Sequence, residues 1–363
     1  MKVSIYLADQ NPHRDRTLGI TNMTHDLLSE FARRDKIGLS TVVSKSSYRL
    51  LQAGGNENML PWCTDTLLGR LVSDNLHPTL VRSKSDLWFY PKGYLPFFDK
   101  PKVPVVGMVH DTILLWYYDY YKHERSALDY LYWLNLMKRS IARFDLILTI
   151  SEHAKAQILN LCSRFNINPP PIKVTYESVR YIGEPFVSNK GEYVLHLASR
   201  APHKKTKWLV DVWLDLASKG FDLPVLKMVG SVPAGMDNVI NKNPLIEKMP
   251  RLSDAEFKET LARARVLIVP SEIEGFGLPA LEAYCLGTPA CYVKGTAVDE
   301  VLSSKDGIGG FDLNSSESLV SALEKTLEMP VSDIMDMKHE IEAKYSISRF
   351  ADRVLSHMSD LMK

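Results

Sequence analysis

The stretch Val266-Leu-Ile-Val-Pro-Ser-Glu-Ile-Glu-Gly-Phe-Gly-Leu-Pro-Ala-Leu-Glu-Ala283 decides the fold. It begins with four apolar residues ended by Pro270, a pattern typical of a buried strand in a parallel sheet. A turn with Gly275 and Gly277 follows, and Pro279 then opens a predicted helix, where the missing N–H group of proline costs nothing. The stretch therefore predicts a strand, a glycine turn and a helix N-terminus in succession.

This order of elements predicts an anion site. A helix N-terminus carries partial positive charge and free N–H groups, and glycines let the backbone approach a phosphate. Glu274 and Glu282 flank the turn, and their carboxylates can accept hydrogen bonds from hydroxyl groups. A diphosphate between two acids would suit a nucleotide sugar. The alternative is that Glu274 is solvated and that Glu282 only favours the start of the helix.

Composition bounds the remaining interpretation. A chain of 363 residues is long enough for two domains, and 45% hydrophobic with 24% charged residues is ordinary for a soluble globular protein. A formal net charge of +1 gives no reason to expect nucleic acid binding. The four cysteines show no metal-ligand spacing, so we expect free thiols in a reducing cytosol. No apolar run reaches the roughly 18 residues that a membrane-spanning helix needs, so we expect a cytoplasmic protein.

Predicted strands and helices alternate along the chain, which indicates an α/β fold with parallel sheets. The expected strands cover residues 3–7, 39–43, 87–90, 103–109, 146–150, 172–175, 193–198, 225–229, 266–269 and 290–293. The expected helices cover residues 21–33, 123–143, 152–164, 208–219, 254–263, 317–328 and 333–363, with a break near Ser346. A Gly- and Pro-containing stretch at 183–191 resembles a linker, after which the alternation restarts. The G-x-G-x-x-G fingerprint is absent, which disfavours a dehydrogenase.

Three further segments are candidates for function. A basic loop, Arg200-Ala-Pro-His-Lys-Lys-Thr-Lys207, follows a strand and can face a diphosphate; Arg200 and Lys205 are the stronger candidates, and Lys204 and Lys207 fit ordinary solvated charges. His110 lies at the carboxyl end of a strand, where it can bind a substrate or be a hydrogen-bonded core imidazole. Gly19, after the first strand, is either a functional loop residue or an ordinary turn glycine.

The segment Trp116-Tyr-Tyr-Asp-Tyr-Tyr121 is densely aromatic. Such rings can stack on sugars, lie at a membrane surface or belong to the core. In the helix predicted for 123–143, apolar residues recur at helical spacing, which favours a core face over an interfacial helix. The apolar positions are Ala127, Leu128, Leu131, Leu134, Met137 and Ile141.

At this point the chain resembles a known family. Glu274-Gly-Phe-Gly-Leu-Pro-Ala-Leu-Glu282 resembles the E-x7-E signature of the retaining glycosyltransferases of family 4, also called glycosyl transferases group 1. Val109-His-Asp-Thr-Ile-Leu-Leu115 and Ser199-Arg-Ala-Pro-His-Lys-Lys205 are similar to the family's histidine strand end and its phosphate loop. Lys294-Gly-Thr-Ala-Val-Asp-Glu300 and Tyr345-Ser-Ile-Ser-Arg-Phe-Ala351 resemble two further family segments. The resemblance runs over nearly the whole chain and is more specific in its C-terminal half.

The resemblance implies a GT-B fold, with two Rossmann-like domains facing each other across a cleft. It implies an acceptor domain at 1–185, a nucleotide-sugar donor domain at 186–345, and a C-terminal helix at 346–363 that packs back on the N-terminal domain. It implies a retaining hexosyltransferase that needs no metal and no cofactor. The donor would be a GDP-, UDP- or dTDP-linked sugar, and the acceptor a glycan or a lipid-linked glycan. A lipid-linked acceptor would bring the protein to the inner face of the cell membrane.

The resemblance also implies roles for single residues. Glu274 would hold hydroxyls of the donor sugar, Glu282 the ribose, and Arg200 with Lys205 the diphosphate. His110 would touch the donor sugar from the N-terminal domain, and Gly19 would lie against the phosphates. The remaining donor contacts would come from Arg251 and Leu252 near the base and from the turn residues Gly275, Phe276, Gly277 and Leu278.

The chain departs from the family pattern in its N-terminal glycines. The usual glycine pair is Thr17-Leu-Gly-Ile20 here, with one glycine, which puts the N-terminal phosphate contact in doubt. Ser199 replaces the glycine before Arg200. Bacterial surface polysaccharide synthesis by mannosyl- or rhamnosyl-type transferases is the expected setting. Two alternatives stay open, namely a nucleotide-sugar 2-epimerase of the same fold and a non-catalytic protein that binds nucleotide sugars.

Overall fold

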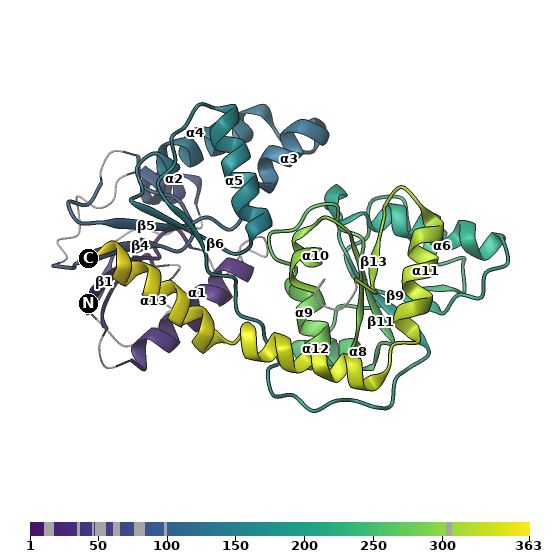
Figure 1. Ribbon diagram of the computed structural model, residues 1–363. Coiled ribbons are helices and arrows are strands. Elements are labelled where there is room, and N and C mark those ends of the chain that lie inside the picture. Colours follow the sequence, from purple (N-terminus) through teal and green to yellow (C-terminus); the bar gives the residue numbers. More distant parts are fainter. Residues whose placement is uncertain are drawn as a thin grey trace. The chain divides into compact units, whose positions relative to one another are not determined.

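The computed structural model describes residues 1–10, 18–34, 37–45, 47, 56–60, 66–75, 84–97, 100–302 and 307–363. The chain divides into two compact units (Figure 1). Unit 1 comprises Met1–Ser178 with Ile347–Lys363, and unit 2 comprises Val179–Ser346. Each unit contains one sheet in which all strand pairs of the described residues are parallel. This confirms the predicted α/β class with two consecutive parallel-sheet halves.

Unit 1 has a seven-stranded sheet in the order β3-β2-β1-β4-β5-β6-β7. Its strands are β1 (Lys2–Tyr6), β2 (Gly38–Val43), β3 (Asn56–Met59), β4 (Leu87–Tyr90), β5 (Val105–Met108), β6 (Leu146–Thr149) and β7 (Ile172–Val174). Its helices are α1 (Leu18–Ala32), α2 (Leu67–Asn75), α3 (Ile113–Tyr120), η3 (Lys122–Glu124), α4 (Ala127–Ile141), α5 (Glu152–Arg164) and α13 (Ile347–Leu361).

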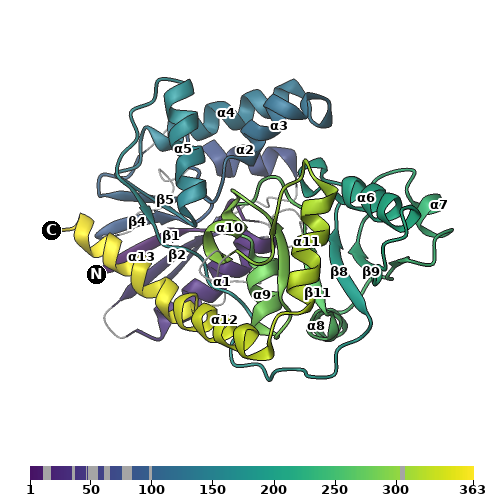
Figure 2. The same ribbon diagram turned by 45° about the vertical axis from the view of Figure 1, so that its right-hand side comes forward.

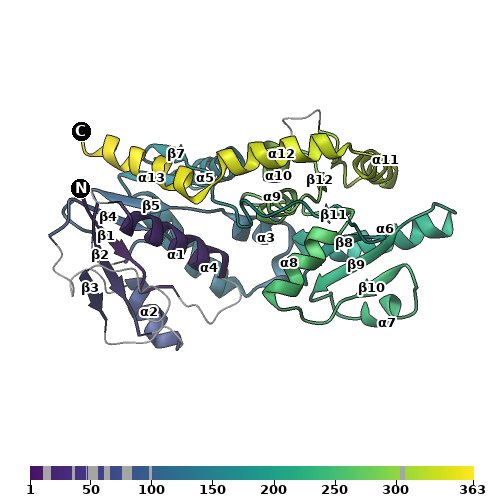
Figure 3. The ribbon, with the colours of Figure 1, turned by 90° about the horizontal axis from the view of Figure 1, so that it is seen from below.

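The sheet of unit 1 is buried on both faces. Successive strand residues point to opposite faces, so neighbours such as Val105 and Val106 belong to different apolar clusters. One face packs against α1 and α13, and the other packs against α4 and α5. Phe350 and Val354 of α13 are fully buried in the first cluster, so the C-terminal helix packs on the N-terminal unit (Figure 3). This is the return of the C-terminal helix that the resemblance implied.

The apolar stripe predicted on α4 is right for one half of the helix and wrong for the other. Leu134, Met137 and Ile141 are buried in the core as expected. Leu128 and Leu131 are 78% and 51% exposed. In the first two turns of α4 the buried face is formed instead by the aromatic rings of Tyr130 and Trp133, so these leucines face outward.

Unit 2 has a six-stranded sheet in the order β10-β9-β8-β11-β12-β13. Its strands are β8 (Tyr193–Ala198), β9 (Val225–Gly230), β10 (Ile246–Lys248), β11 (Val266–Val269), β12 (Ala290–Val293) and β13 (Gly310–Phe311). Its helices are η4 (Pro202–Lys204), α6 (Thr206–Ser218), α7 (Asp237–Ile240), α8 (Asp254–Arg263), α9 (Leu278–Cys285), α10 (Ala297–Leu302), α11 (Ser316–Leu327) and α12 (Val331–Lys344).

Local sequence explains where these elements begin and end. The apolar run of β11 and the helix α8 have the predicted bounds, and Ser253 with Glu256 forms a capping box at the start of α8. On one face of the sheet, Trp213 of α6 is fully buried among side chains of the strands and of α11. The helices α6 and α11 lie near each other in Figure 2. The short edge strands β10 and β13 were not predicted, because two or three residues carry no readable periodicity.

Candidate active site

Two neighbouring strands of unit 2 direct their loops to the same edge of the sheet. β8 and β11 pair in parallel, so the segment at 199–205 (the β8 loop) and the segment at 270–277 (the β11 loop) leave from the same side. After β8 the chain continues to β9 on one flank, and after β11 it continues to β12 on the other. Such a reversal of strand order is where ligands bind in open α/β sheets.

A buried histidine ties the start of the β8 loop to β11. Nδ1 of His196 lies 3.0 Å from the carbonyl oxygen of Ile268, which can only accept, so Nδ1 carries the hydrogen. Nε2 of His196 lies 2.9 Å from Oγ1 of Thr206, which in turn accepts the N–H of Ser199 at 3.0 Å. The Thr206 hydroxyl therefore donates to Nε2. Sequence reasoning did not single out His196, because within β8 it looks like an ordinary strand residue.

Three contacts join the β8 loop to the β11 loop. The N–H of Glu272 donates to the carbonyl oxygen of His203 at 3.0 Å. Nζ of Lys204 lies 2.5 Å from Oε1 of Glu274, and Nζ of Lys205 lies 2.7 Å from Oε2 of Glu272. Lys204 is therefore paired with a candidate site residue and is not the solvated charge that its position in a basic run suggested. Lys207 does fit a solvated charge, because its ion pair with Asp211 is exposed on both sides.

Glu274 is buried and ionised. Glu274 is 8% exposed, and burial alone would raise the pKa of its carboxyl group. The charge and hydrogen bond of Lys204, with a hydrogen bond from Ser271, outweigh burial and hold the pKa of Glu274 below its ordinary value. A buried carboxylate with one cationic partner keeps free lone pairs for other donors, as recognition of sugar hydroxyls requires.

The glycine turn between Glu274 and α9 depends on its tertiary surroundings. Gly277 adopts φ +96, and a Cβ atom there would lie 2.6 Å from Cγ2 of Val298. The ring of Phe276 is 2% exposed and packs edge-on against Tyr345, with ring centroids 5.3 Å apart. Phe276 therefore anchors the turn through its side chain. Gly275 is buried in the same turn, and Leu278 is the first residue of α9.

Glu282 is paired with an arginine that the sequence did not indicate. Nε of Arg180 lies 2.8 Å from Oε1 of Glu282, and a terminal guanidinium nitrogen (NH2) lies 3.2 Å from Oε2. The Glu282 side chain is 6% exposed and the Arg180 side chain 50% exposed. The two residues are 102 positions apart, so no local pattern could have linked them.

The other candidates of unit 2 lie outside this network. Arg200 is exposed in the β8 loop, and no ion pair of its guanidinium occurs within the described ranges. Arg251 is exposed and Leu252 half-buried in the segment before α8. The described ion pairs and hydrogen bonds bring together Glu274, Lys204, Lys205 and Glu272. Within the described ranges, neither Arg251 nor Leu252 takes part in this network.

The candidates of unit 1 have different surroundings. Gly19 is exposed in the first turn of α1, since the helix begins at Leu18 and not at the predicted residue 21. The rest of the predicted loop, residues 11–17, lies outside the described residues. His110 follows β5 and is buried, and its Nε2 donates to the carbonyl oxygen of Pro91 at 2.8 Å. Burial lowers the pKa of His110 to about 4, so its imidazole is neutral at pH 7.

The described residues provide neither a metal-binding cluster nor a membrane-spanning helix. No group of three or more His, Cys, Asp or Glu side chains is placed to hold a metal ion in the described ranges. No helix in that part of the chain combines the length and apolar character of a membrane span. Cys162, Cys285 and Cys291 are free and buried, whereas Cys63 lies outside the described residues.

Buried histidines predict how stability depends on pH. Burial lowers the pKa of His110, His196 and His203 to about 4, whereas in the unfolded chain the pKa is about 6.5. The unfolded state therefore binds more protons between these values. The free energy of unfolding should fall as pH falls from about 6.5, by up to about 1.4 kcal/mol per pH unit for each histidine.

Urea denaturation at pH 7.5, 6.0 and 5.0 measures this effect. Replacing His196 with Asn should flatten the dependence, and replacing the exposed His123 should leave it unchanged. Equal stability at pH 7.5 and 5.0 would contradict the prediction.

The fold and the site together define a class. Two consecutive parallel-sheet units, a C-terminal helix that returns to the first unit, and paired loops at the strand-order reversal of the second unit are the GT-B architecture of glycosyltransferases. Residues 182–344, nearly all of unit 2, match the family model "Glycosyl transferases group 1". The part of the chain that forms unit 2 is therefore similar to this family.

Curated relatives are similar over part of the chain. The O-antigen chain mannosyltransferase RfbU of Salmonella typhimurium strain LT2 is 25% identical over 261 residues, which are 70% of this chain and 66% of that protein. A D-inositol 3-phosphate glycosyltransferase of a Nocardioides species is 26% identical over 137 residues, which are 37% of this chain and 30% of that protein. The matches thus span just under two thirds of the first relative and less than a third of the second.

Solved structures agree over the whole chain. Anabaena HepE in complex with UDP and glucose has a TM-score of 0.63 at 15% identity, covering 99% of this chain and 100% of that one. Sucrose-phosphate synthase from Thermosynechococcus elongatus has a TM-score of 0.69 at 13% identity, covering 99% of both chains. At these identities the likeness shows the fold alone, and it confirms the GT-B class.

Proposed function

We propose that this protein is a retaining glycosyltransferase of family 4. It transfers a hexosyl group from a nucleotide-diphosphate sugar to an acceptor hydroxyl. One observation carries the proposal: at the strand-order reversal, the β8 and β11 loops bring a buried, ionised Glu274 together with two lysines beside a glycine turn and a helix N-terminus. The similarity to an O-antigen chain mannosyltransferase supports surface polysaccharide synthesis as the setting.

The chemistry follows from the charges. The bond between the anomeric carbon and the diphosphate oxygen breaks, and a bond from the same carbon to the acceptor oxygen forms on the same face. The acceptor proton passes to the departing phosphate oxygen. Arg200, Lys205 and the N–H groups at the start of α9 stabilise the negative charge on the leaving diphosphate without a metal. Glu274 accepts hydrogen bonds from sugar hydroxyls and thereby orients the donor.

Turnover tests the proposal. The purified protein is incubated with UDP-, GDP- and dTDP-linked hexoses, with and without acceptor glycans, and the products are followed by NMR. Transfer with retained anomeric configuration in the presence of EDTA is the expected result. Epimerisation at C2 without an acceptor would identify an epimerase instead. Binding of a donor with no conversion across the acceptor panel would identify a binding protein.

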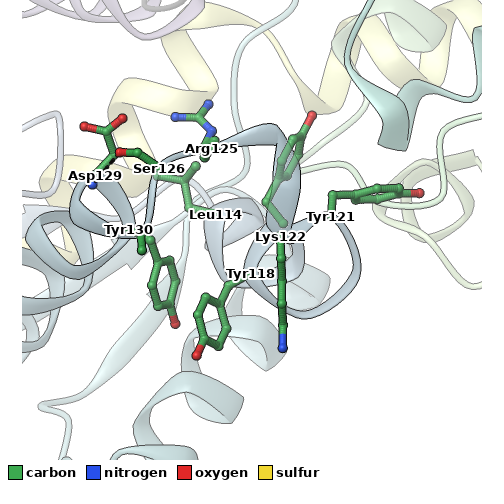
Figure 4. A pocket seen from close by; sticks show the side chains of 10 residues that line it. Leu114, Tyr118, Tyr121, Lys122, Arg125, Ser126, Asp129 and Tyr130 are labelled. Atoms are coloured by element: carbon green, nitrogen blue, oxygen red, sulfur yellow. Dashed lines mark hydrogen bonds between the residues drawn. The ribbon is translucent and has the colours of Figure 1, made fainter.

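The aromatic segment supports a membrane contact. A pocket of about 160 Å³ lies between α3, η3 and α4, and Tyr118 stacks on Tyr130 at its side, with ring centroids 4.0 Å apart (Figure 4). Lys122 and Arg125 line the same pocket, next to the exposed Leu128 on α4. Cations beside exposed apolar side chains match an anionic lipid surface. The protein would then work in the cytoplasm at the inner face of the membrane.

Vesicle sedimentation tests this contact. Binding to vesicles with phosphatidylglycerol should exceed binding to pure phosphatidylcholine vesicles. Replacing both Leu128 and Leu131 with Ser should weaken binding, whereas replacing the exposed Val239 of unit 2 should not. Equal binding by the Leu variant would exclude α4 as the contact.

A further inference from the structure

Arg180 holds the carboxylate of Glu282 in one orientation. The planar guanidinium meets both carboxylate oxygens, at 2.8 Å and 3.2 Å, and this two-point contact fixes the plane of the carboxylate as a single hydrogen bond could not. The hydrogen bonds to Glu282 raise the pKa of Arg180 above its ordinary value, so the guanidinium stays protonated throughout the accessible pH range.

The pair does not use up the hydrogen-bonding capacity of Glu282. Two carboxylate oxygens offer about four lone-pair positions, and the Arg180 fork occupies one on each oxygen. Glu282 lies on α9, the helix whose N-terminus carries the glycine turn, and its side chain is 6% exposed. A buried carboxylate on this helix with its plane fixed and lone pairs left on both oxygens can accept from two adjacent hydroxyl groups at once.

The surroundings of Arg180 keep it in place. Its guanidinium carbon lies 5.3 Å from the ring centre of Tyr181, and the backbone N–H of Val179 donates to the carbonyl oxygen of Tyr345 at 3.0 Å. Tyr345 in turn packs against Phe276 of the glycine turn. The segment that carries Arg180 is thus attached to the same turn that precedes α9, and the two ends of the pair are held by one packed cluster.

We propose that Arg180 is a positioning residue for the donor ribose. Arg180 orients the Glu282 carboxylate so that it accepts hydrogen bonds from both the 2′- and the 3′-hydroxyl group of the ribose. The protein thereby selects ribonucleotides over 2′-deoxyribonucleotides. The inference rests on the proposed function and on the role that the family resemblance implies for Glu282, which is to hold the donor ribose. Among the donor classes considered above, it favours UDP- and GDP-sugars over dTDP-sugars, because the thymidine nucleotide lacks the 2′-hydroxyl.

Calorimetric titration with nucleoside diphosphates tests the inference on the full-length protein. The probes are UDP and GDP, each paired with its 2′-deoxy form. For the base that binds more tightly, the wild-type protein should prefer the ribonucleotide by roughly 10-fold, the size expected for a hydrogen bond to a charged group. Arg180→Gln should reduce this preference to roughly 2-fold or less. Arg265→Gln should keep it, because Arg265 is a half-buried arginine of the same unit that pairs with Glu192.

Three further variants separate positioning from folding. Arg180→Lys keeps the positive charge but not the two-point guanidinium contact with both carboxylate oxygens. It should therefore lose most of the preference for ribonucleotides, while its melting temperature stays close to that of the wild type. Glu282→Gln and the double variant Arg180→Gln/Glu282→Gln should show the same low preference, because both residues act through one carboxylate. An Arg180→Lys or Arg180→Gln protein that is folded and keeps the full preference overturns the inference while the proposed function stands. A wild-type protein that binds dTDP but neither UDP nor GDP overturns the inference while the proposed function stands. A wild-type protein that binds none of the three nucleotides overturns both.

Discussion

Replacing Lys205 with Ala should lower kcat by about 10²- to 10³-fold, with a smaller change in KM for the donor. The reason is that Lys205 would act mainly on the charge that develops on the leaving diphosphate, and removing one such group from a preorganised site costs about this much. Replacing Arg200 with Ala should have a similar effect. The double variant should lose less than the product of the single losses, because both cations serve one leaving group. Initial rates at saturating donor measure these losses.

The ion pair of Lys205 supplies the matched control. Nζ of Lys205 lies 2.7 Å from Glu272, so a bound diphosphate competes with that carboxylate for the lysine. Glu272→Gln removes the competitor and leaves the lysine, and it should bind UDP or GDP as tightly as wild type or more tightly. Wild-type rates in both Lys205→Ala and Arg200→Ala would show that the β8 loop is not the diphosphate site.

Replacing Lys204 with Met should destabilise unit 2 by about 1–3 kcal/mol at pH 7. The substitution leaves the Glu274 carboxylate buried without its cation, and uncompensated buried charges are costly; the 29% exposure of the Lys204 side chain keeps the figure below that of a fully buried pair. Without the charge and hydrogen bond of Lys204, the effect of burial dominates, and the pKa of Glu274 should rise. Urea denaturation of the variant and the wild type measures the difference in stability.

The pH dependence of that difference gives a second check. Wild-type Glu274 has a lowered pKa, so its contribution is present above the unfolded pKa and is lost as pH falls through the folded value. In Lys204→Met, the Glu274 carboxyl group becomes protonated at a higher pH than in the wild type and is then no longer a buried charge. The loss of stability relative to wild type should therefore shrink as pH falls from 7 to 5. Lys204→Met/Glu274→Gln should recover most of the stability. A deficit that persists in the double variant would mean that Lys204 acts through other contacts.

The sequence determined the class of fold because its signals are local. Four apolar residues ended by Pro270 mark β11, and the Ser253–Glu256 capping box marks the start of α8; both elements were predicted with the bounds that the structure has. Strand and helix propensities and capping act over a few residues, so they can be read without knowing what lies nearby. The E-x7-E spacing and the basic loop were readable for the same reason, and they directed attention to the edge of the sheet in unit 2 where the β8 and β11 loops meet.

Only the tertiary structure decided which charges meet. Lys204 and Lys205 are adjacent and chemically alike, and the turn at η4 with a left-handed Lys205 (φ 52) sends one to Glu274 and the other to Glu272. Arg180 reaches Glu282 across 102 residues, and Leu128 faces outward because Tyr130 fills its expected place in the core. Side-chain partners such as these depend on the packing of distant segments, and no periodicity or spacing along the chain records that packing.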